Sequence, residues 1–187
     1  MNLHSLLGEQ PGSKAVETLL AEASRKVTQD SVVPSPTVKV YKDAVYHSYS
    51  QLGISFNYEP SNPLAPAAYL APGTAPPDPS LLSLVAIHLY NSPTDKFATF
   101  PLAFIINIPR DATDGKGAAA EIDMSKRAHE VVQLLGEPEE KVGGGRQGNC
   151  WIGYNKSIGL AVDFAGSSWD DGDMTIASLT LSLPDGN

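Results

Sequence analysis

One short strand pattern occurs twice in this chain, about a hundred residues apart. The stretches 53-GISFNYE-59 and 159-GLAVDFA-165 each open on a glycine, and apolar side chains then fall on alternate positions. Such alternation is typical of a β-strand with one buried and one exposed face. A chain of 187 residues that contains the same half-buried strand twice must cover two similar apolar sheet faces. This requirement restricts the fold more than any other feature of the sequence.

The elements around the two strands recur in the same order. The helical pattern SKAVETLL, which begins at Ser13, corresponds to SKRAHEVVQLL, which begins at Ser125. The strand pattern SLVAIHLY corresponds in the same way to the closing TIASLTLSL. We interpret this order as a tandem duplication. The predicted fold class is α+β, with two tandem helix-plus-antiparallel-sheet repeats that share a core, the first at residues 1–95 and the second at residues 96–187.

Each predicted repeat begins with an amphipathic helix. Over residues 13–26 the apolar side chains follow helical spacing, and Ser13 is suited to accept a backbone N–H bond at the start. The second helix is predicted over residues 123–136, with Asp123 or Ser125 as its cap and Gly136 as its stop. The polar segments 110–121 and 137–140 are interpreted as loops.

A proline-rich segment interrupts the first predicted repeat. Seven of the 15 prolines lie within residues 60–79. Proline lacks the backbone N–H that a central strand must donate, so the segment is predicted to be a loop insertion in a hairpin. A flexible spacer is the simpler interpretation of it, and a docking site for a proline motif is the alternative.

Composition and charge limit the classes of partner. The chain has 13 Lys and Arg against 21 Asp and Glu, which gives a net charge of −8. Nucleic acids and anionic membranes require clustered cations, so we expect neither as a partner. The N-terminal segment does not read as a signal peptide, and no segment reads as a membrane span. Because the lone Cys150 cannot form an intramolecular disulfide, we expect a reducing, cytoplasmic location.

Searches for catalytic and metal-binding patterns find little in the sequence. The four histidines have no metal-ligand spacing, and the acidic bend 169-WDDGD-173 does not have the spacing of a calcium loop. We therefore expect no metal and no cofactor, and we interpret the bend as a solvated turn. An enzyme that uses Cys150, His88 or Asp170 is the least favoured alternative, because no recognisable catalytic arrangement surrounds them.

Aromatic residues are the remaining candidates for a functional surface. They gather in corresponding zones of the two predicted repeats. Tyrosine and tryptophan are favoured at interfaces because each offers a large rigid surface with a polar end. We predict a partner-binding surface on the sheet face opposite the helices, with five candidate residues: Tyr46, Tyr49, Trp151, Tyr154 and Trp169.

Several of these patterns, taken in order, resemble a known group of proteins. The order runs Y-x-SY-x-x-x-GISF, then a helix ending in LLGEP, then W-x-x-Y and a closing L-T-L. This order resembles a widespread, poorly characterised, immunity-like family of bacterial accessory proteins. The unit made of the helix ending in LLGEP and the W-x-x-Y pattern is also similar to the repeated modules of the β-lactamase inhibitor protein and to the small lipoprotein of the outer-membrane assembly machine. The resemblance implies protein binding without catalysis, and it carries over no catalytic residues.

Two functions therefore follow from the sequence as hypotheses. The first is a non-enzymatic intracellular protein-binding module of inhibitor or immunity type, for which the acidic charge favours a basic partner. The alternative is a carrier of a small apolar ligand, with a pocket between the sheet and the helices. The oligomeric state does not follow from the sequence.

Overall fold

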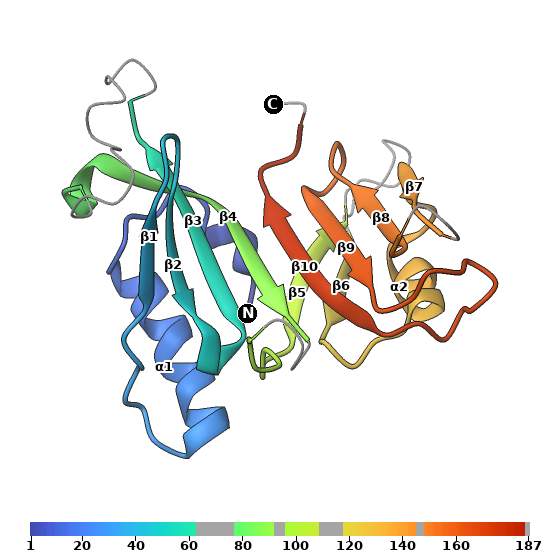
Figure 1. Cartoon of the computed structure of the whole chain (residues 1–187), viewed down its shortest axis with the longest axis horizontal. Coiled ribbons are helices and arrows are strands. Elements are labelled where there is room, and N and C mark those ends of the chain that lie inside the picture. The colour runs from blue at the N-terminus through green and yellow to red at the C-terminus, as the bar shows by residue number, and fades with distance from the viewer. Residues whose placement is uncertain (63–76, 92–95, 109–117, 145–147, 186–187) are drawn as a thin grey trace.

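The computed structural model describes residues 1–62, 77–91, 96–108, 118–144 and 148–185, and it has two layers (Figure 1). One layer is an eight-stranded antiparallel sheet, and the other contains two helices and a two-stranded sheet. The mixed α+β fold class with a mainly antiparallel sheet is thereby confirmed. The large sheet consists of β1 (Thr37–Val40), β2 (Val45–Tyr49), β3 (Ile54–Pro60), β4 (Leu82–Tyr90), β7 (Glu140–Val142), β8 (Trp151–Tyr154), β9 (Leu160–Phe164) and β10 (Ile176–Ser182).

The second layer covers one face of the large sheet. It contains α1 (Lys14–Thr28), α2 (Ala128–Leu135), β5 (Phe104–Ile108) and β6 (Ala118–Ile122). Figure 1 shows α1 behind the first strands, α2 behind the last strands, and the β5–β6 ribbon between them. The described residues also form three short 3₁₀ helices: η1 (Leu3–Leu6), η2 (Ser50–Leu52) and η4 (Pro79–Leu81).

The strand order of the large sheet is β1-β2-β3-β4-β10-β9-β8-β7. The two central strands, β4 and β10, are far apart in the chain and pair antiparallel, with Leu89 opposite Leu179 and Ile87 opposite Leu181. From this central pair the strands follow in descending chain order toward both edges. All seven pairs of neighbouring strands are antiparallel.

Helix α1 forms as its sequence predicts. The Ser13 hydroxyl accepts a hydrogen bond from the Val16 N–H at 3.4 Å and so caps the first turn. Val16, Leu19, Leu20 and Ala23 lie on one face of the helix and are buried. Gln29 closes the helix in the left-handed conformation, with its N–H bonded to the Arg25 carbonyl. The apolar stripe therefore sets which side of α1 lies on the sheet.

Helix α2 is shorter than predicted, because it begins at Ala128. The Asp123 carboxylate caps a separate turn, where it accepts the Ser125 N–H at 2.8 Å, so neither Asp123 nor Ser125 caps the helix. Arg127 then forms a bridge with Thr175. Pairing with the chain just before β10 thus replaces the first predicted helical turn.

Two segments that we interpreted as loops contain strands. Residues 118–122, at the end of the predicted loop 110–121, form β6 and pair with β5. Glu140, at the end of the predicted loop 137–140, begins β7 and pairs with β8 at the sheet edge. The proline-rich segment 60–79 lies mostly outside the described residues, which include only its ends: β3 stops at Pro60, and η4 begins at Pro79.

The buried apolar side chains form one cluster that draws on both halves of the chain. Alternate strand residues enter it, such as Ile54, Phe56 and Tyr58 from β3 and Leu160, Val162 and Phe164 from β9. These are the same alternate positions that the sequence pattern indicated. The cluster lies between the sheet and the layer of helices, so the opposite sheet face contributes little to it.

Gly53 and Gly159, which open the two similar strands, occupy similar positions. Both are left-handed, with φ of 65° and 73°. The Gly53 carbonyl accepts the Tyr90 N–H at 2.9 Å, and the Gly159 carbonyl accepts the Ser182 N–H at 2.8 Å. A Cβ atom on Gly53 would clash with the Ala98 carbonyl oxygen, and one on Gly159 with the Ser182 carbonyl oxygen. Gly53 therefore allows the backbone of residues 98–100 to approach closely, and Gly159 allows the same for the backbone at the end of β10.

We expect Gly159→Ala to destabilise the protein more than Gly12→Ala. Gly12 is also left-handed, at φ 75°, but a Cβ there meets nothing within 4 Å. Gly12→Ala should therefore cost about 1 kcal/mol for the left-handed backbone, and Gly159→Ala should cost roughly 1–3 kcal/mol more for the displaced strand. Urea unfolding of the two variants measures the difference, and equal losses would contradict the close approach at Gly159.

Candidate functional site

The candidate site lies on the sheet face that the helices leave uncovered, which we call the open face. Strand residues alternate, so neighbours of the core residues point to it. Cross-strand register then places Ser48, Ser55, His88, Thr180 and Ala161 in one row across β2, β3, β4, β10 and β9. The open face is made of these residues together with Tyr46, Asn57, Ala86, Tyr90, Trp151, Gly153, Asp163 and Ser178.

Hydrogen bonds between neighbouring strands connect several of these side chains. The Ser48 and Ser55 hydroxyl oxygens are 2.9 Å apart. His88 Nδ1 lies 3.1 Å from the Thr180 hydroxyl oxygen across the central strand pair. These contacts hold a polar surface in fixed register over the middle of the sheet.

Two polar atoms of the open face have an unused hydrogen-bonding capacity. Asn57 Oδ1 and His88 Nε2 are shielded from solvent, and neither has a hydrogen-bond partner among the described residues. Such atoms are uncommon in folded proteins and call for an explanation. The His88 ring also stacks on Tyr46, with centroids 6.1 Å apart. A bound group that supplies a donor to Asn57 would satisfy the amide oxygen.

A hollow of about 500 Å³ lies on the part of the open face formed by β1, β2 and β3. Its floor is formed by small polar side chains, and aromatic rings stand around it. The lining residues are Lys39, Tyr41, Asp43, Ala44, Tyr46, Ser48, Ser55, Asn57, Glu59, Tyr90 and Phe97. The volume is within the range of small-ligand and side-chain pockets.

The hollow has an acidic character. Among the described residues that line it, the carboxylates of Asp43 and Glu59 stand against a single ammonium, that of Lys39. Burial raises the pKa of Tyr46, and the neighbouring Asp43, Tyr41 and Glu59 raise it further. The negative charge of both carboxylates therefore extends to the Tyr46 hydroxyl, at the edge of the hollow.

The structure separates the five predicted aromatic residues. Tyr46 and Trp151 are half-buried on the open face, as predicted. Strand side chains alternate between the two faces. Tyr49 follows Tyr46 by three residues, and Tyr154 follows Trp151 by three, so Tyr49 and Tyr154 lie on the helix-covered face. Tyr154 is buried, and its hydroxyl donates to the Gly136 carbonyl at 2.8 Å. Placing Tyr49 and Tyr154 opposite the helices was therefore wrong.

Trp169 also lies on the helix-covered side of the sheet. Its indole N–H donates to the Gly143 carbonyl at 3.1 Å, and its ring contacts the buried Phe164 edge-on. It borders a second hollow, of about 310 Å³, between α2 and the sheet. The apolar part of this hollow consists of Val132, Ile152, Phe164, Trp169 and Met174.

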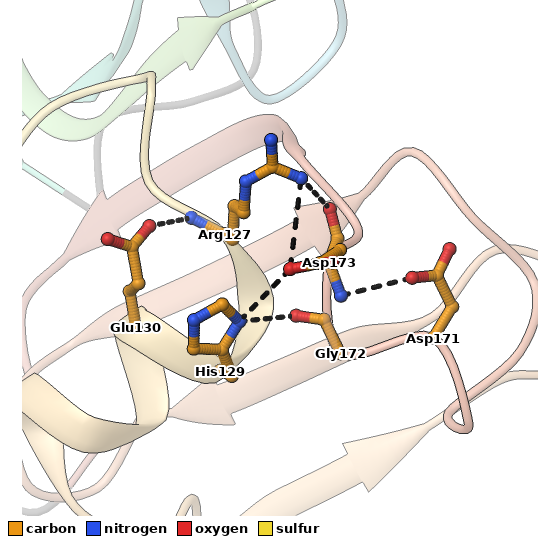
Figure 2. Close-up of polar contacts among 6 residues, drawn as sticks. All are labelled: Arg127, His129, Glu130, Asp171, Gly172 and Asp173. Atoms are coloured by element: carbon orange, nitrogen blue, oxygen red, sulfur yellow. Dashed lines mark hydrogen bonds and ion pairs between the residues drawn. The ribbon is translucent and has the colours of Figure 1, made fainter.

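The acidic bend at 169–173 is hydrogen-bonded to the start of α2 (Figure 2). Asp171 accepts the Asp173 N–H at 3.0 Å, as expected for a turn. Arg127 Nη1 donates to the Asp173 carbonyl at 3.0 Å, and His129 Nδ1 donates to the Gly172 carbonyl at 2.8 Å. The Arg127–Asp173 ion pair is exposed and contributes little stability. The bend therefore positions α2, and its carboxylates do not converge on one point.

The residues of the enzyme alternative are dispersed. Cys150 is fully buried in the hydrophobic cluster, and burial raises the pKa of its thiol, which disfavours the reactive thiolate. His88 lies on the open face, and Asp170 is exposed on the bend. Within the described ranges, no three His, Cys, Asp or Glu side chains gather as ligands for a metal ion.

Comparisons with other proteins find no match for this chain among protein-family models, curated proteins or solved structures. The immunity-like resemblance of the sequence thus stays a prediction. Among the helices that the structure describes, none has the length and apolar character needed to cross a membrane.

Sequence reasoning missed most of the hollow. Tyr41, Asn57, Tyr90 and Phe97 line it but were not among the predicted site residues. Tyr90 and Asn57 could have been found from strand alternation, which places them on the face opposite their buried neighbours. Tyr41 and Phe97 lie outside the strands, so no local pattern indicates that they meet the same surface.

We expect stability to fall between about pH 7.5 and about pH 5.5. Burial lowers the pKa of His4, His47 and His88 below the ordinary 6.5. The unfolded chain then binds more protons than the folded one just below pH 6.5. The free energy of unfolding therefore has its full value above that pH and decreases as the pH falls. Urea unfolding at both pH values measures the loss.

The variant His88→Gln should reduce this pH dependence, whatever its effect on stability at pH 7.5. Around His88, Tyr46 packs from β2 and Thr180 from β10, and neither side chain titrates in this range. The lowered carboxyl pKa of Asp123 acts only below about pH 4. An unchanged free energy of unfolding across the range would contradict the burial of the histidines.

The matched variants Tyr154→Phe and Tyr46→Phe should differ in stability. Tyr154→Phe leaves the Gly136 carbonyl without its hydroxyl donor, at a cost of about 1–3 kcal/mol. Tyr46→Phe removes a hydroxyl beside the open hollow and should change stability by less than about 0.5 kcal/mol. Thermal unfolding compares the two. The opposite ranking would mean that the two faces are wrongly assigned.

Proposed function

We propose that this protein is a non-enzymatic protein-binding module and that its partner docks on the open face. The observation that carries the proposal is the uneven covering of the large sheet. One face is buried under α1, α2 and the β5–β6 ribbon, and the other bears polar and aromatic side chains in fixed register. A surface of aromatic rings and hydrogen-bonding groups is typical of protein interfaces.

The extent of the open face favours a protein over a small molecule as its partner. Tyr46 on β2 and Trp151 on β8 are separated by five strand spacings, or about 24 Å at about 4.8 Å each. A ligand that contacts both rings must span this distance. The two candidate aromatic residues on the open face therefore suit opposite ends of one docked protein surface.

We further propose that the chain is a tandem duplication of one helix-plus-sheet unit. The order α1, β1, β2, β3, β4 corresponds to α2, β7, β8, β9, β10, with β4 and β10 paired at the centre. The like backbone conformation and hydrogen bonding of Gly53 and Gly159 support the correspondence. Two joined units would supply a broader continuous binding face than one unit of four strands.

The charge of the chain favours a basic partner. The net charge is −8, and complementary charge speeds association and excludes like-charged proteins. Inhibitor-type or immunity-type binding in the cytoplasm agrees with this charge and with the resemblance of the sequence patterns. Nucleic acid and anionic membranes remain unfavoured for the same electrostatic reason.

The hollow beside α2 favours a second candidate function, the carriage of a small apolar ligand. It measures about 310 Å³, and its inner surface includes Val132, Ile152 and Met174 between helix and sheet. This is the location that the carrier hypothesis requires. Its size would admit only a small ligand.

We expect a photo-crosslinking amino acid at position 161 to form a discrete protein adduct in extracts of the cells that make this protein. Ala161 lies on the open face in β9, whereas Leu134 is 39% exposed on α2, on the other side of the molecule. The crosslinker at position 134 is the matched control and should give no adduct. Gel electrophoresis and mass spectrometry identify the adducts.

Excess unmodified protein should abolish the adduct, and excess Tyr46→Ala,Trp151→Ala protein should not, because it lacks both open-face aromatic residues. Equal adducts from both positions, or none from position 161, would contradict binding through the open face. If adducts are absent and an apolar ligand raises the melting temperature in a way that Trp169→Ala abolishes, the carrier function is favoured instead.

A further inference from the structure

Four aromatic rings stand around the hollow of about 500 Å³ on the open face. Tyr41 and Tyr46 meet edge to face, with centroids 5.6 Å apart and planes at 87°. Tyr90 and Phe97 stack, with centroids 3.9 Å apart and planes at 21°. Two strands and two loops therefore contribute rings to one concave surface. The faces of such rings are electron-rich and attract cations.

The other lining groups are mainly oxygen acceptors. Ser48 and Ser55 form the floor and bond to one another. Asn57 Oδ1 is shielded from solvent and has no hydrogen-bond partner in the described part of the chain. The carboxylates of Asp43 and Glu59 also line the hollow. An amide oxygen and two carboxylates are complementary to a group that donates hydrogen bonds and carries positive charge.

Among the described residues that line the hollow, Lys39 is the single cation. It is exposed, and no ion pair within 4.0 Å joins it to Asp43 or Glu59. With two carboxylates and one ammonium, the described part of the lining carries a net negative charge. The hollow can therefore accommodate a further cation, which the described part of the chain does not itself supply.

We propose that this hollow receives an arginine side chain of a basic protein partner. A guanidinium is planar, so it can stack on a tyrosine ring while its N–H groups donate to Asn57 Oδ1 and to a carboxylate. A lysine ammonium offers three donors at one point and does not stack in this way. The hollow is open to solvent, which allows a side chain to enter from a docked surface.

The electrostatics agree with this assignment. The same two carboxylates that line the hollow raise the pKa of the Tyr46 hydroxyl, so their negative charge is felt where the guanidinium would lie. The chain as a whole is acidic at −8, which steers basic segments toward it. A local cation site and a favourable long-range field therefore act on the same kind of partner.

The inference rests on the proposed protein-binding function and specifies which side chain of the partner the open face binds. Its test uses the full chain and a capped pentapeptide with one arginine between glycines. The matched peptides carry citrulline, which keeps the shape without the charge, or lysine. We expect the arginine peptide to shift the backbone NMR signals of Ser48, Ser55 and Asn57. Citrulline should bind at least about tenfold more weakly, and lysine more weakly than arginine.

Charge variants test the lining groups without removing any ring. Asp43→Asn and Glu59→Gln should each weaken the arginine peptide several-fold, about threefold or more. Glu22→Gln changes the net charge by the same amount from an exposed position on α1, so it is the matched control and should change the affinity little. Thermal unfolding confirms that each variant is folded.

The variant Lys39→Gln tests whether the bound group is positively charged. It should tighten binding of the arginine peptide, because it removes a like charge from the hollow. Weaker binding in Lys39→Gln, equal binding of citrulline or lysine, or no shift at about 10 mM arginine peptide would each overturn the assignment. Adducts from position 161 can still form in that case, so failure here is distinguishable from failure of the protein-binding function.

Discussion

The antiparallel pairing of β4 with β10 is the interaction on which the rest of the structure depends. Their pairing joins β1 to β4 on one side and β7 to β10 on the other into one eight-stranded sheet. Leu89 and Leu179 meet on the covered face, and His88 and Thr180 meet on the open face. A single register therefore fixes both the alignment of the buried cluster and the continuity of the polar surface. A slip by one residue would exchange the two faces.

Covering one face of a sheet determines the character of the other. The helices and the β5–β6 ribbon remove apolar side chains from water on their side, and this burial stabilises the fold. The open face is thereby released from packing requirements, so it can hold features that cost stability, such as Asn57 Oδ1, which has no hydrogen-bond partner in the described parts of the chain. Such features persist only where the surrounding strands hold them in place. A rigid sheet is well suited to present a binding surface.

The sequence predicted the elements whose causes are local. Helix α1 follows from the Ser13 cap and an apolar stripe, and the buried sides of β3 and β9 follow from alternation. The start of α2 was misjudged because Arg127 pairs with Thr175, which is distant in the chain. The edge strand β7 was missed because its three residues are all exposed and have no alternation to detect.

The candidate site was predicted only in part, for the same reason. Alternation within a strand could assign Tyr46 and Trp151 to one face, and it could also have excluded Tyr154. The hollow depends on the β1–β2 turn, which brings Tyr41 beside Tyr46, and on the segment after β4, which brings Phe97 against Tyr90. Contacts of this kind arise from tertiary packing, which no window of sequence contains.

The two similar strands share a backbone pattern but present different side chains on the open face. If the halves are duplicates, Ser55, Asn57 and Glu59 correspond to Ala161, Asp163 and Ala165. The Asp163 carboxylate accepts a hydrogen bond from the Ser178 hydroxyl at 3.0 Å, whereas Asn57 Oδ1 has no partner among the described residues. Asp163 is thus hydrogen-bonded within the sheet, and Ala161 and Ala165 stand at the positions that correspond to the polar Ser55 and Glu59. Of the described residues at these positions, only Asn57 in the first half has a shielded acceptor without a partner, which favours docking of an arginine there while the second half contributes Trp151 and contact area.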